Sequence, residues 1–198
     1  MHAISLLFVL VFFSLTVSAK TILFLGDSLT EGYQLSKEEA YPAVVERELK
    51  KKRADIKVIN GGVSGATTAS GLKRLDWYLK SKPDMMVLAL GSNDGLRGLK
   101  TTQTEKNLAE VIEKAQERDI TVVLAGAKMP TNYGEPYRTD FEKVFSTLAK
   151  KYKLAFIPFL LEGVGGNPKL NLADGLHPNP AGHEMMAKNV LKVLESEL

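Results

Sequence analysis

The sequence predicts an α/β fold in which helices cover both faces of a parallel sheet. Apolar segments of strand length alternate along the chain with segments whose apolar residues recur every three or four positions. Such alternation is typical of parallel β-α-β units. The segment 85–90, Met-Met-Val-Leu-Ala-Leu, also shows no polar alternation. This pattern is expected of a central strand that is buried on both sides.

Five strands are expected, each followed by a helix. The strands are predicted at 21–25, 56–59, 85–90, 120–125 and 154–158. The helices are predicted at 41–52, 68–80, 102–118 and 137–152, with a closing helix from Pro180 onward. The helix at 137–152 has one apolar stripe, made of Tyr137, Phe141, Val144, Phe145, Leu148 and Tyr152. The closing helix is introduced by Asn179, a capping residue, and then by a proline at the first helical position.

The first 19 residues differ in kind from the rest of the chain. Residues 1–19 contain no Lys, Arg, Asp or Glu, and residues 6–15 are almost continuously apolar. Val17-Ser18-Ala19 offers the small residues that suit a signal-peptidase site. A membrane anchor is the alternative, but the apolar stretch is short for a membrane span. We therefore expect a cleaved signal peptide at 1–19, a single domain at 20–198, and an exported protein, periplasmic or secreted.

The composition narrows the classes of function. With 44% hydrophobic residues in 198, the chain can bury a sizeable core. A net charge of +3 is too small to indicate nucleic-acid binding. The chain has no cysteine, which excludes disulfide bonds and a thiol nucleophile.

Ser28 follows the first predicted strand and is the candidate nucleophile. It lies on a turn that starts at Gly26, a residue whose backbone adopts angles that a side chain would forbid. Ligands of parallel sheets bind outside the carboxyl ends of the strands, so this serine would face the substrate. A hydroxyl needs an adjacent base to act as a nucleophile. Taken alone, Ser28 could equally be a helix-capping serine.

His177 is the candidate base, and Asp174 is the candidate carboxylate that orients it. Of the three histidines, His2 lies in the apolar leader and His183 is expected on the surface of the last helix. Asp174 precedes His177 by three residues across a turn, close enough for its carboxylate to accept the imidazole Nδ1–H. Nε2 would then be free to take the Ser28 proton. An Asp-x-x-His pair could also bind a metal or cap a turn, but no further ligand has convincing metal spacing.

Three donors could stabilise a developing oxyanion. Gly65 follows the second strand and has no side chain, so its N–H can approach a substrate oxygen closely. Asn93 offers an amide N–H from the end of the central strand, and the Ser28 N–H would complete the set. Each has a plain alternative, because asparagine forms turns and glycine is common in loops.

These segments together resemble the four sequence blocks of the SGNH, or GDSL, hydrolases. The blocks are Gly26-Asp27-Ser28-Leu29, Gly65, Gly91-x-Asn93-Asp94 and Asp174-x-x-His177-Pro178. They match in order and spacing over nearly all of residues 21–195. The resemblance is strongest to bacterial periplasmic acyl-CoA thioesterases, lysophospholipases and arylesterases. It implies a three-layer α/β/α flavodoxin-like fold with a five-stranded parallel sheet. It also implies Ser28 as nucleophile, His177 as base, Asp174 as orienting carboxylate, and an oxyanion hole from Ser28, Gly65 and Asn93.

The expected reaction is hydrolysis of an ester or thioester through an acyl-enzyme on Ser28. No cofactor or metal is needed for it, and we expect a monomer that acts on a small-molecule acyl substrate. Loops 95–101 and 128–139 should border the site and hold the acyl chain, through Leu96, Leu99, Met129, Pro130 and Tyr133. Two alternatives stay open: a short-chain carbohydrate acetylesterase of the same superfamily, and an exported lipid- or glycan-binding module without catalysis.

Overall fold

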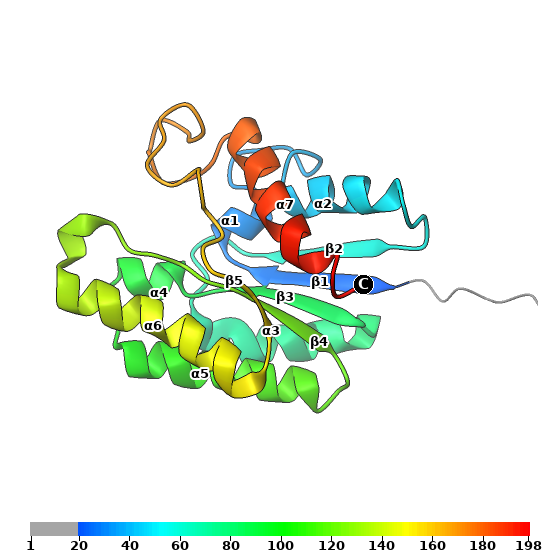
Figure 1. Ribbon diagram of the computed structural model, residues 1–198, viewed down its shortest axis with the longest axis horizontal. Helices are drawn as coiled ribbons and strands as arrows, with labels where there is room; N and C mark the ends of the chain where they lie inside the picture. Colours follow the sequence, from blue (N-terminus) through cyan, green and yellow to red (C-terminus); the bar gives the residue numbers. More distant parts are fainter. Residues whose placement is uncertain (1–19) are drawn as a thin grey trace, which may run out of the picture.

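The computed structural model describes residues 20–198 and confirms the three-layer α/β/α class (Figure 1). One sheet of five parallel strands has the order β2-β1-β3-β4-β5. The strands are β1 (Thr21–Gly26), β2 (Lys57–Gly62), β3 (Met85–Ala89), β4 (Thr121–Ala125) and β5 (Ala155–Ile157). The helices are α1 (Ser28–Glu31), α2 (Tyr41–Lys50), α3 (Gly71–Tyr78), α4 (Ser92–Leu96), α5 (Thr101–Gln116), α6 (Glu135–Tyr152) and α7 (Pro180–Leu194). The signal peptide expected at 1–19 lies outside the described residues.

Two apolar cores enclose the sheet. Ile22 and Phe24 of β1 are fully buried on one face, in a core shared with α2 and α7. Leu23 and Leu25 point to the other face, in a core shared with α3, α5 and α6. Figure 1 shows the same division, with α2 and α7 on one side of the sheet and the other long helices opposite. Both faces of β1 are therefore shielded from solvent, which explains why the central strands are continuous apolar runs.

The predicted elements correspond to observed ones, with differences at the ends. The helix expected at 68–80 is divided into a 3-10 turn at Thr68–Ser70, α3, and a second 3-10 turn at Leu79–Ser81. The short helix α4 was not predicted, because Ser92-Asn93-Asp94-Gly95 has neither apolar periodicity nor strong helix formers.

The strand order places three loops side by side at one edge of the sheet. β1 pairs with β2 on one side and with β3 on the other, so that Gly26 is level with Gly62 and with Ala89. The residues that follow β1, β2 and β3 therefore begin at the same height. Ser28, Gly65 and Asn93 lie in the segments directly after these three strands.

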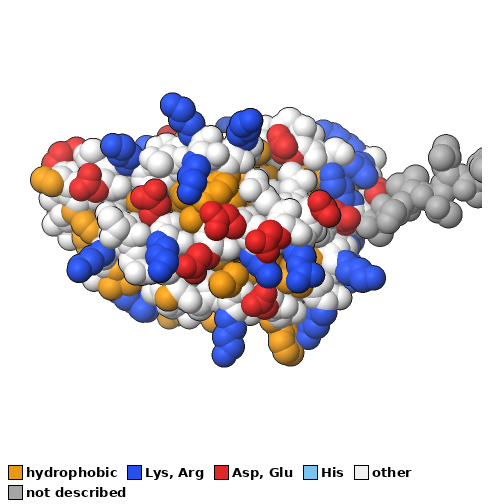
Figure 2. Space-filling view, turned by 90° about the horizontal axis from the view of Figure 1, so that it is seen from below, with side chains coloured by type: hydrophobic (Ala, Val, Ile, Leu, Met, Phe, Trp, Pro, Cys, Tyr) orange, Lys and Arg blue, Asp and Glu red, His pale blue; other side chains and the backbone are white. Residues whose placement is uncertain are grey.

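The surface carries both signs of charge. On the face shown in Figure 2, Lys and Arg side chains are interspersed with Asp and Glu. Such mixing produces no extended field of one sign. Among residues 20–198, no helix combines the length and apolarity that crossing a membrane requires.

Candidate active site

Ser28 lies at the first turn of α1, directly after β1. The turn depends on Gly26, because a Cβ there would lie 1.9 Å from the Thr30 hydroxyl oxygen. Asp27 caps α1 by accepting the Leu29 N–H at 3.0 Å, as short polar side chains do at helix starts. The strand thus passes into a helix within one residue, and the serine is held partly exposed at the sheet edge.

A chain of hydrogen bonds joins Ser28, His177 and Asp174. The Ser28 Oγ lies 3.0 Å from His177 Nε2, and His177 Nδ1 lies 2.6 Å from Asp174 Oδ2. The other oxygen of Asp174 accepts the main-chain N–H groups of Leu176 and His177, at 2.9 and 3.0 Å. The bonds from His177, main chain first and ring second, lower the pKa of Asp174 to about 2. An ionised carboxylate fixes Nδ1 as the donor, so Nε2 can accept the serine proton.

Hydrogen bonds within the loop that carries His177 join its two ends. Leu172 donates its N–H to the His177 carbonyl at 2.7 Å, and Asn171 forms an antiparallel bridge with Pro178. The buried Asn171 side chain donates to the carbonyls of Val164 and Asn167, both at 2.8 Å. A long loop is thereby stiffened where the imidazole projects from it.

Tyr33 is a site residue that the sequence analysis missed. Its ring lies against the His177 imidazole with centroids 4.3 Å apart and planes inclined by 35°. Tyr33 comes from the loop after α1, five positions beyond Ser28. That closeness to the nucleophile in the sequence was the one available signal, because nothing in a loop tyrosine by itself indicates a contact with a histidine 144 positions away.

Two further oxyanion candidates flank Ser28. Gly65 has a positive φ of +76° and is exposed in the loop after β2. Asn93, in the first turn of α4, donates one amide hydrogen to the Ala66 carbonyl at 3.0 Å. This bond connects the two loops and leaves the second amide hydrogen of Asn93 free to donate. The main-chain N–H groups of Ser28 and Gly65 have no acceptor among residues 20–198.

Asp94 holds the same two loops together from inside. Its buried carboxylate accepts the Thr68 N–H at 2.9 Å and the Thr68 hydroxyl, and lies 3.5 Å from the Thr104 hydroxyl. Thr68 follows the Gly65 loop and Asp94 follows Asn93. The geometry between Gly65 and Asn93 is therefore fixed by a buried polar network.

Asp27 and Arg74 are two charged residues at the ends of β1 and β2, next to Ser28 in the case of Asp27. Arg74 donates to the carbonyls of Gly26, at 2.9 Å, and Gly61, so it joins the ends of β1 and β2. Burial raises the pKa of the Asp27 carboxyl from 3.8 to about 6. Its Oδ2 has no hydrogen-bond partner among the described residues.

The expected acyl-chain residues divide into a buried and an exposed group. Met129 is 5% exposed and packs against Gly95 and Phe141. Leu96 is partly buried, and its carbonyl accepts the Tyr133 hydroxyl at 2.9 Å. Leu99 and Pro130 are exposed. These contacts hold the loops after β3 and β4 against each other on the Asn93 side of Ser28.

The surface position expected for His183 is wrong. His183 is 1% exposed, and its Nδ1 accepts the Tyr41 N–H at 3.0 Å. It therefore supplies the N-terminal cap of α2, for which Ala40 has no suitable side chain. Desolvation lowers the pKa of His183 from 6.5 to about 4, so it is neutral at pH 7.

A serine, a histidine and an aspartate in one hydrogen-bonded chain, beside unpaired N–H donors, are the constellation of a serine hydrolase. Residues 24–185 match the model of the GDSL-like lipase/acylhydrolase family, and the chain belongs to that family. The family resemblance noted in the sequence is thereby confirmed.

Curated proteins and solved structures resemble the chain over most of its length. It is 37% identical to the esterase TesA of Pseudomonas aeruginosa, over 94% of this chain and 93% of the relative. It is 36% identical to an arylesterase of Vibrio mimicus, over 98% and 100%. It is 35% identical to thioesterase 1/protease 1/lysophospholipase L1 of Escherichia coli, over 90% and 85%. The crystal structure of TesA superposes with a TM-score of 0.87, at 37% identity, covering 90% of this chain and 100% of that one.

Proposed function

We propose that this protein is a serine hydrolase that cleaves carboxylic ester and thioester bonds through an acyl-enzyme on Ser28. The observation that carries the proposal is the unbroken chain from Ser28 Oγ through His177 to Asp174, with separations of 3.0 and 2.6 Å. The names of the relatives support the same bond types, since they include esterase, arylesterase and thioesterase.

The reaction follows from the positions of these groups. His177 Nε2 takes the hydroxyl proton as Ser28 Oγ attacks the acyl carbonyl, and Asp174 stabilises the resulting imidazolium. The N–H groups of Ser28 and Gly65 and the free amide hydrogen of Asn93 stabilise the tetrahedral oxyanion. The protonated His177 then gives its proton to the departing alcohol or thiol. A water activated by the same imidazole cleaves the acyl-enzyme and restores Ser28.

The nucleophile can be tested by covalent labelling. A fluorophosphonate probe should add to the peptide that contains Ser28, as read by mass spectrometry, and should abolish hydrolysis of p-nitrophenyl esters. The Ser28→Ala variant should lose both labelling and activity. Ser146→Ala is a suitable control, because Ser146 is exposed on α6 and, among residues 20–198, its side chain bonds only to the Lys143 carbonyl. Full activity of Ser28→Ala would refute the assignment.

The acyl group of the substrate is proposed to be of medium or long chain length. Leu96, Leu99 and Pro130 offer apolar surface on the loops that border Asn93, and apolar surface favours an alkyl chain. A series of p-nitrophenyl esters from acetyl to palmitoyl tests this point. Activity confined to the acetyl ester would favour the carbohydrate acetylesterase instead.

Export is proposed from the leader sequence alone. Residues 1–19 have the apolar core and small terminal residues of a signal peptide. Expression of the full chain in a bacterial host, followed by cell fractionation and N-terminal sequencing, tests it. A mature protein that begins at Lys20 outside the cytoplasm is expected, and an uncleaved protein in the cytoplasm would contradict it.

A further inference from the structure

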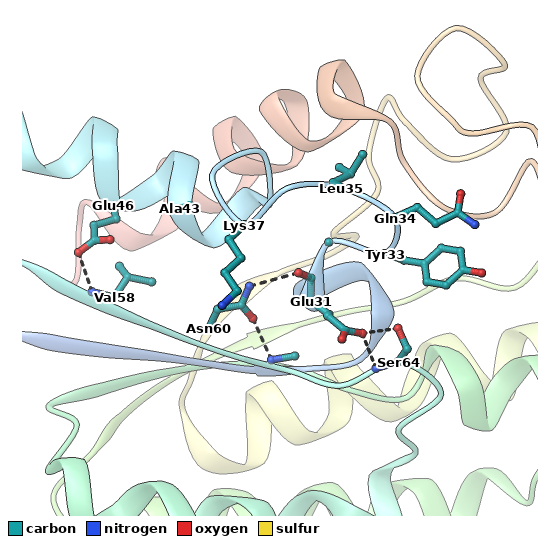
Figure 3. Close-up of a pocket in the computed structure, with 12 residues that line it drawn as sticks. Glu31, Tyr33, Gln34, Leu35, Lys37, Ala43, Glu46, Val58, Asn60 and Ser64 are labelled. Atoms are coloured by element: carbon teal, nitrogen blue, oxygen red, sulfur yellow. Dashed lines mark hydrogen bonds between the residues drawn. The ribbon is translucent and has the colours of Figure 1, made fainter.

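A groove on the β2 side of Ser28 takes no part in the proposed reaction. It has a volume of about 720 Å³ and lies between the loop after α1, helix α2 and the edge strand β2. Figure 3 shows side chains from these elements gathered around it, among them Glu31, Tyr33, Gln34, Lys37, Asn60 and Ser64. The volume is in the range of sites that bind small molecules.

One end of the groove lies beside the catalytic residues. Tyr33 lines it and packs its ring on His177, at 4.3 Å between centroids. Ser64, the neighbour of Gly65, lines it as well. Glu31 belongs to the same short helix as Ser28. Tyr33 therefore connects the groove with the imidazole that protonates the leaving group.

The order of the strands determines which part of a substrate the groove can receive. Ser28 follows β1, the groove borders β2, and the loops proposed to hold the acyl chain follow β3 and β4. Because β1 lies between β2 and β3, the two regions are on opposite sides of the nucleophile. An ester whose acyl chain lies on the β3 side can therefore direct its alcohol portion toward β2.

The floor of the groove is held in place before any ligand arrives. Glu31 accepts the main-chain N–H of Ser64 at 2.8 Å and the Ser64 hydroxyl. Asn60 donates to the Thr30 carbonyl at 2.9 Å and accepts the Gly62 N–H at 2.9 Å. The Val58 N–H likewise donates to Glu46 at 3.2 Å, so side chains pair part of the main-chain edge of β2.

The groove offers a ligand hydrogen-bonding groups of several kinds and of both charges. Gln34 and Lys37 are exposed and form no hydrogen bond with the other residues drawn in Figure 3. Together with the Tyr33 hydroxyl they offer an amide, an ammonium and a phenol, while Glu31 adds a carboxylate and Leu35 and Val58 add apolar wall. A mixture of donors and acceptors with both signs of charge matches hydroxyl groups better than it matches a phosphate, which calls for a cluster of cations.

We propose that this groove is a leaving-group subsite that binds the hydroxyl-rich alcohol portion of the substrate, a sugar-sized polyol. The inference rests on the proposed function, because it needs an ester carbonyl at Ser28. It adds that the enzyme prefers polyol esters over esters of simple alcohols with the same acyl chain. Gln34 and Lys37 are the residues that determine this preference.

The test compares two octanoyl esters that differ only in the alcohol, 6-O-octanoyl glucose and ethyl octanoate. The variants are Gln34→Gly and Lys37→Ala. Glycine suits position 34 because Gln34 has a φ of +61°, so the side chain is removed without backbone strain. Each variant should lower kcat/KM for the glucose ester roughly tenfold, mainly through KM, by loss of hydrogen bonds to hydroxyl groups. Ethyl octanoate should be hydrolysed at the wild-type rate.

The controls separate this inference from the proposed function. Lys57→Ala removes an exposed lysine of β2 that does not line the groove, and it should leave both esters unaffected. Unchanged hydrolysis of the glucose ester by Gln34→Gly and Lys37→Ala would overturn the subsite, and so would equal loss on both esters. If the wild-type protein cleaves neither octanoyl ester, and Ser28 takes no fluorophosphonate, the proposed function itself fails.

Discussion

The buried His183 makes the stability of this protein sensitive to acid. His183 accepts the Tyr41 N–H and so must stay neutral at Nδ1 in the folded state. Its pKa is lowered from 6.5 to about 4, first by desolvation, against an opposing effect of Glu39. At pH values between 4 and 6.5, His183 is protonated in the unfolded chain but neutral in the folded chain. Stability is therefore fully present above pH 6.5 and falls as the pH drops toward 4.

The size of this effect follows from the shift. A lowering of the pKa from 6.5 to about 4 corresponds to about 3 kcal/mol of stability lost on going from pH 7 to pH 4. This is a large fraction of the usual total for a domain. The His183→Gln variant keeps an acceptor for the Tyr41 N–H but cannot take up a proton. Its free energy of unfolding, relative to wild type, should rise by about 3 kcal/mol between pH 7 and pH 4.

Urea titrations at pH 7, 6, 5 and 4 measure this difference directly. Lys188→Gln serves as the control, because Lys188 is exposed on the same helix and its replacement leaves His183 in place. The comparison with wild type cancels the contribution of titrating groups that do not interact with His183, Asp27 among them. A difference between His183→Gln and wild type that stays constant from pH 7 to pH 4 would refute the reasoning.

Three further predictions concern the nucleophile turn and the oxyanion site. The stability of Asp27→Asn relative to wild type should change with pH in the opposite direction. Burial raises the pKa of Asp27 from 3.8 to about 6, so ionisation of this carboxyl destabilises the folded protein as the pH rises. The variant should gain about 2 kcal/mol over wild type between pH 4 and pH 7 in the same titrations, and a flat difference would argue against a buried carboxylate. Asn93→Ala should lower kcat on p-nitrophenyl esters by roughly a hundred- to thousandfold with little change in KM, and a loss confined to KM would mean that Asn93 binds substrate rather than the oxyanion. Gly62→Ala should destabilise the protein by about 1–3 kcal/mol, because the new Cβ would lie 2.1 Å from the Glu31 nitrogen and displace α1; a melting temperature equal to that of wild type would contradict the close approach.

The positions of the catalytic candidates were readable from the sequence, because each follows a strand that the pattern identifies. An apolar run such as 85–90 is typical of a strand covered on both faces, and parallel strands bring their carboxyl ends to one edge. Ser28, Gly65 and Asn93 could therefore be placed at one edge before any coordinates. The Asp174–His177 contact was also local, since a turn of three residues suffices for it.

Residues that act through distant contacts could not be found in this way. Arg74 joins the ends of two strands, and the sequence shows it only as one more basic residue of a helix. Tyr33 gives no sign of its contact with His177. His183 was placed on the wrong face because its partner, Tyr41, lies 142 positions away.

The sequence by itself determined the class of fold, the order of its elements and the chemical groups at the carboxyl edge of the sheet. Those features follow from apolar spacing and from short segments that fold locally. Only the tertiary structure decided which histidine is buried, which charged residues lie at the ends of β1 and β2, and that a polar groove opens on the β2 side. Burial and desolvation depend on every element packed around a group, and no stretch of sequence contains that information.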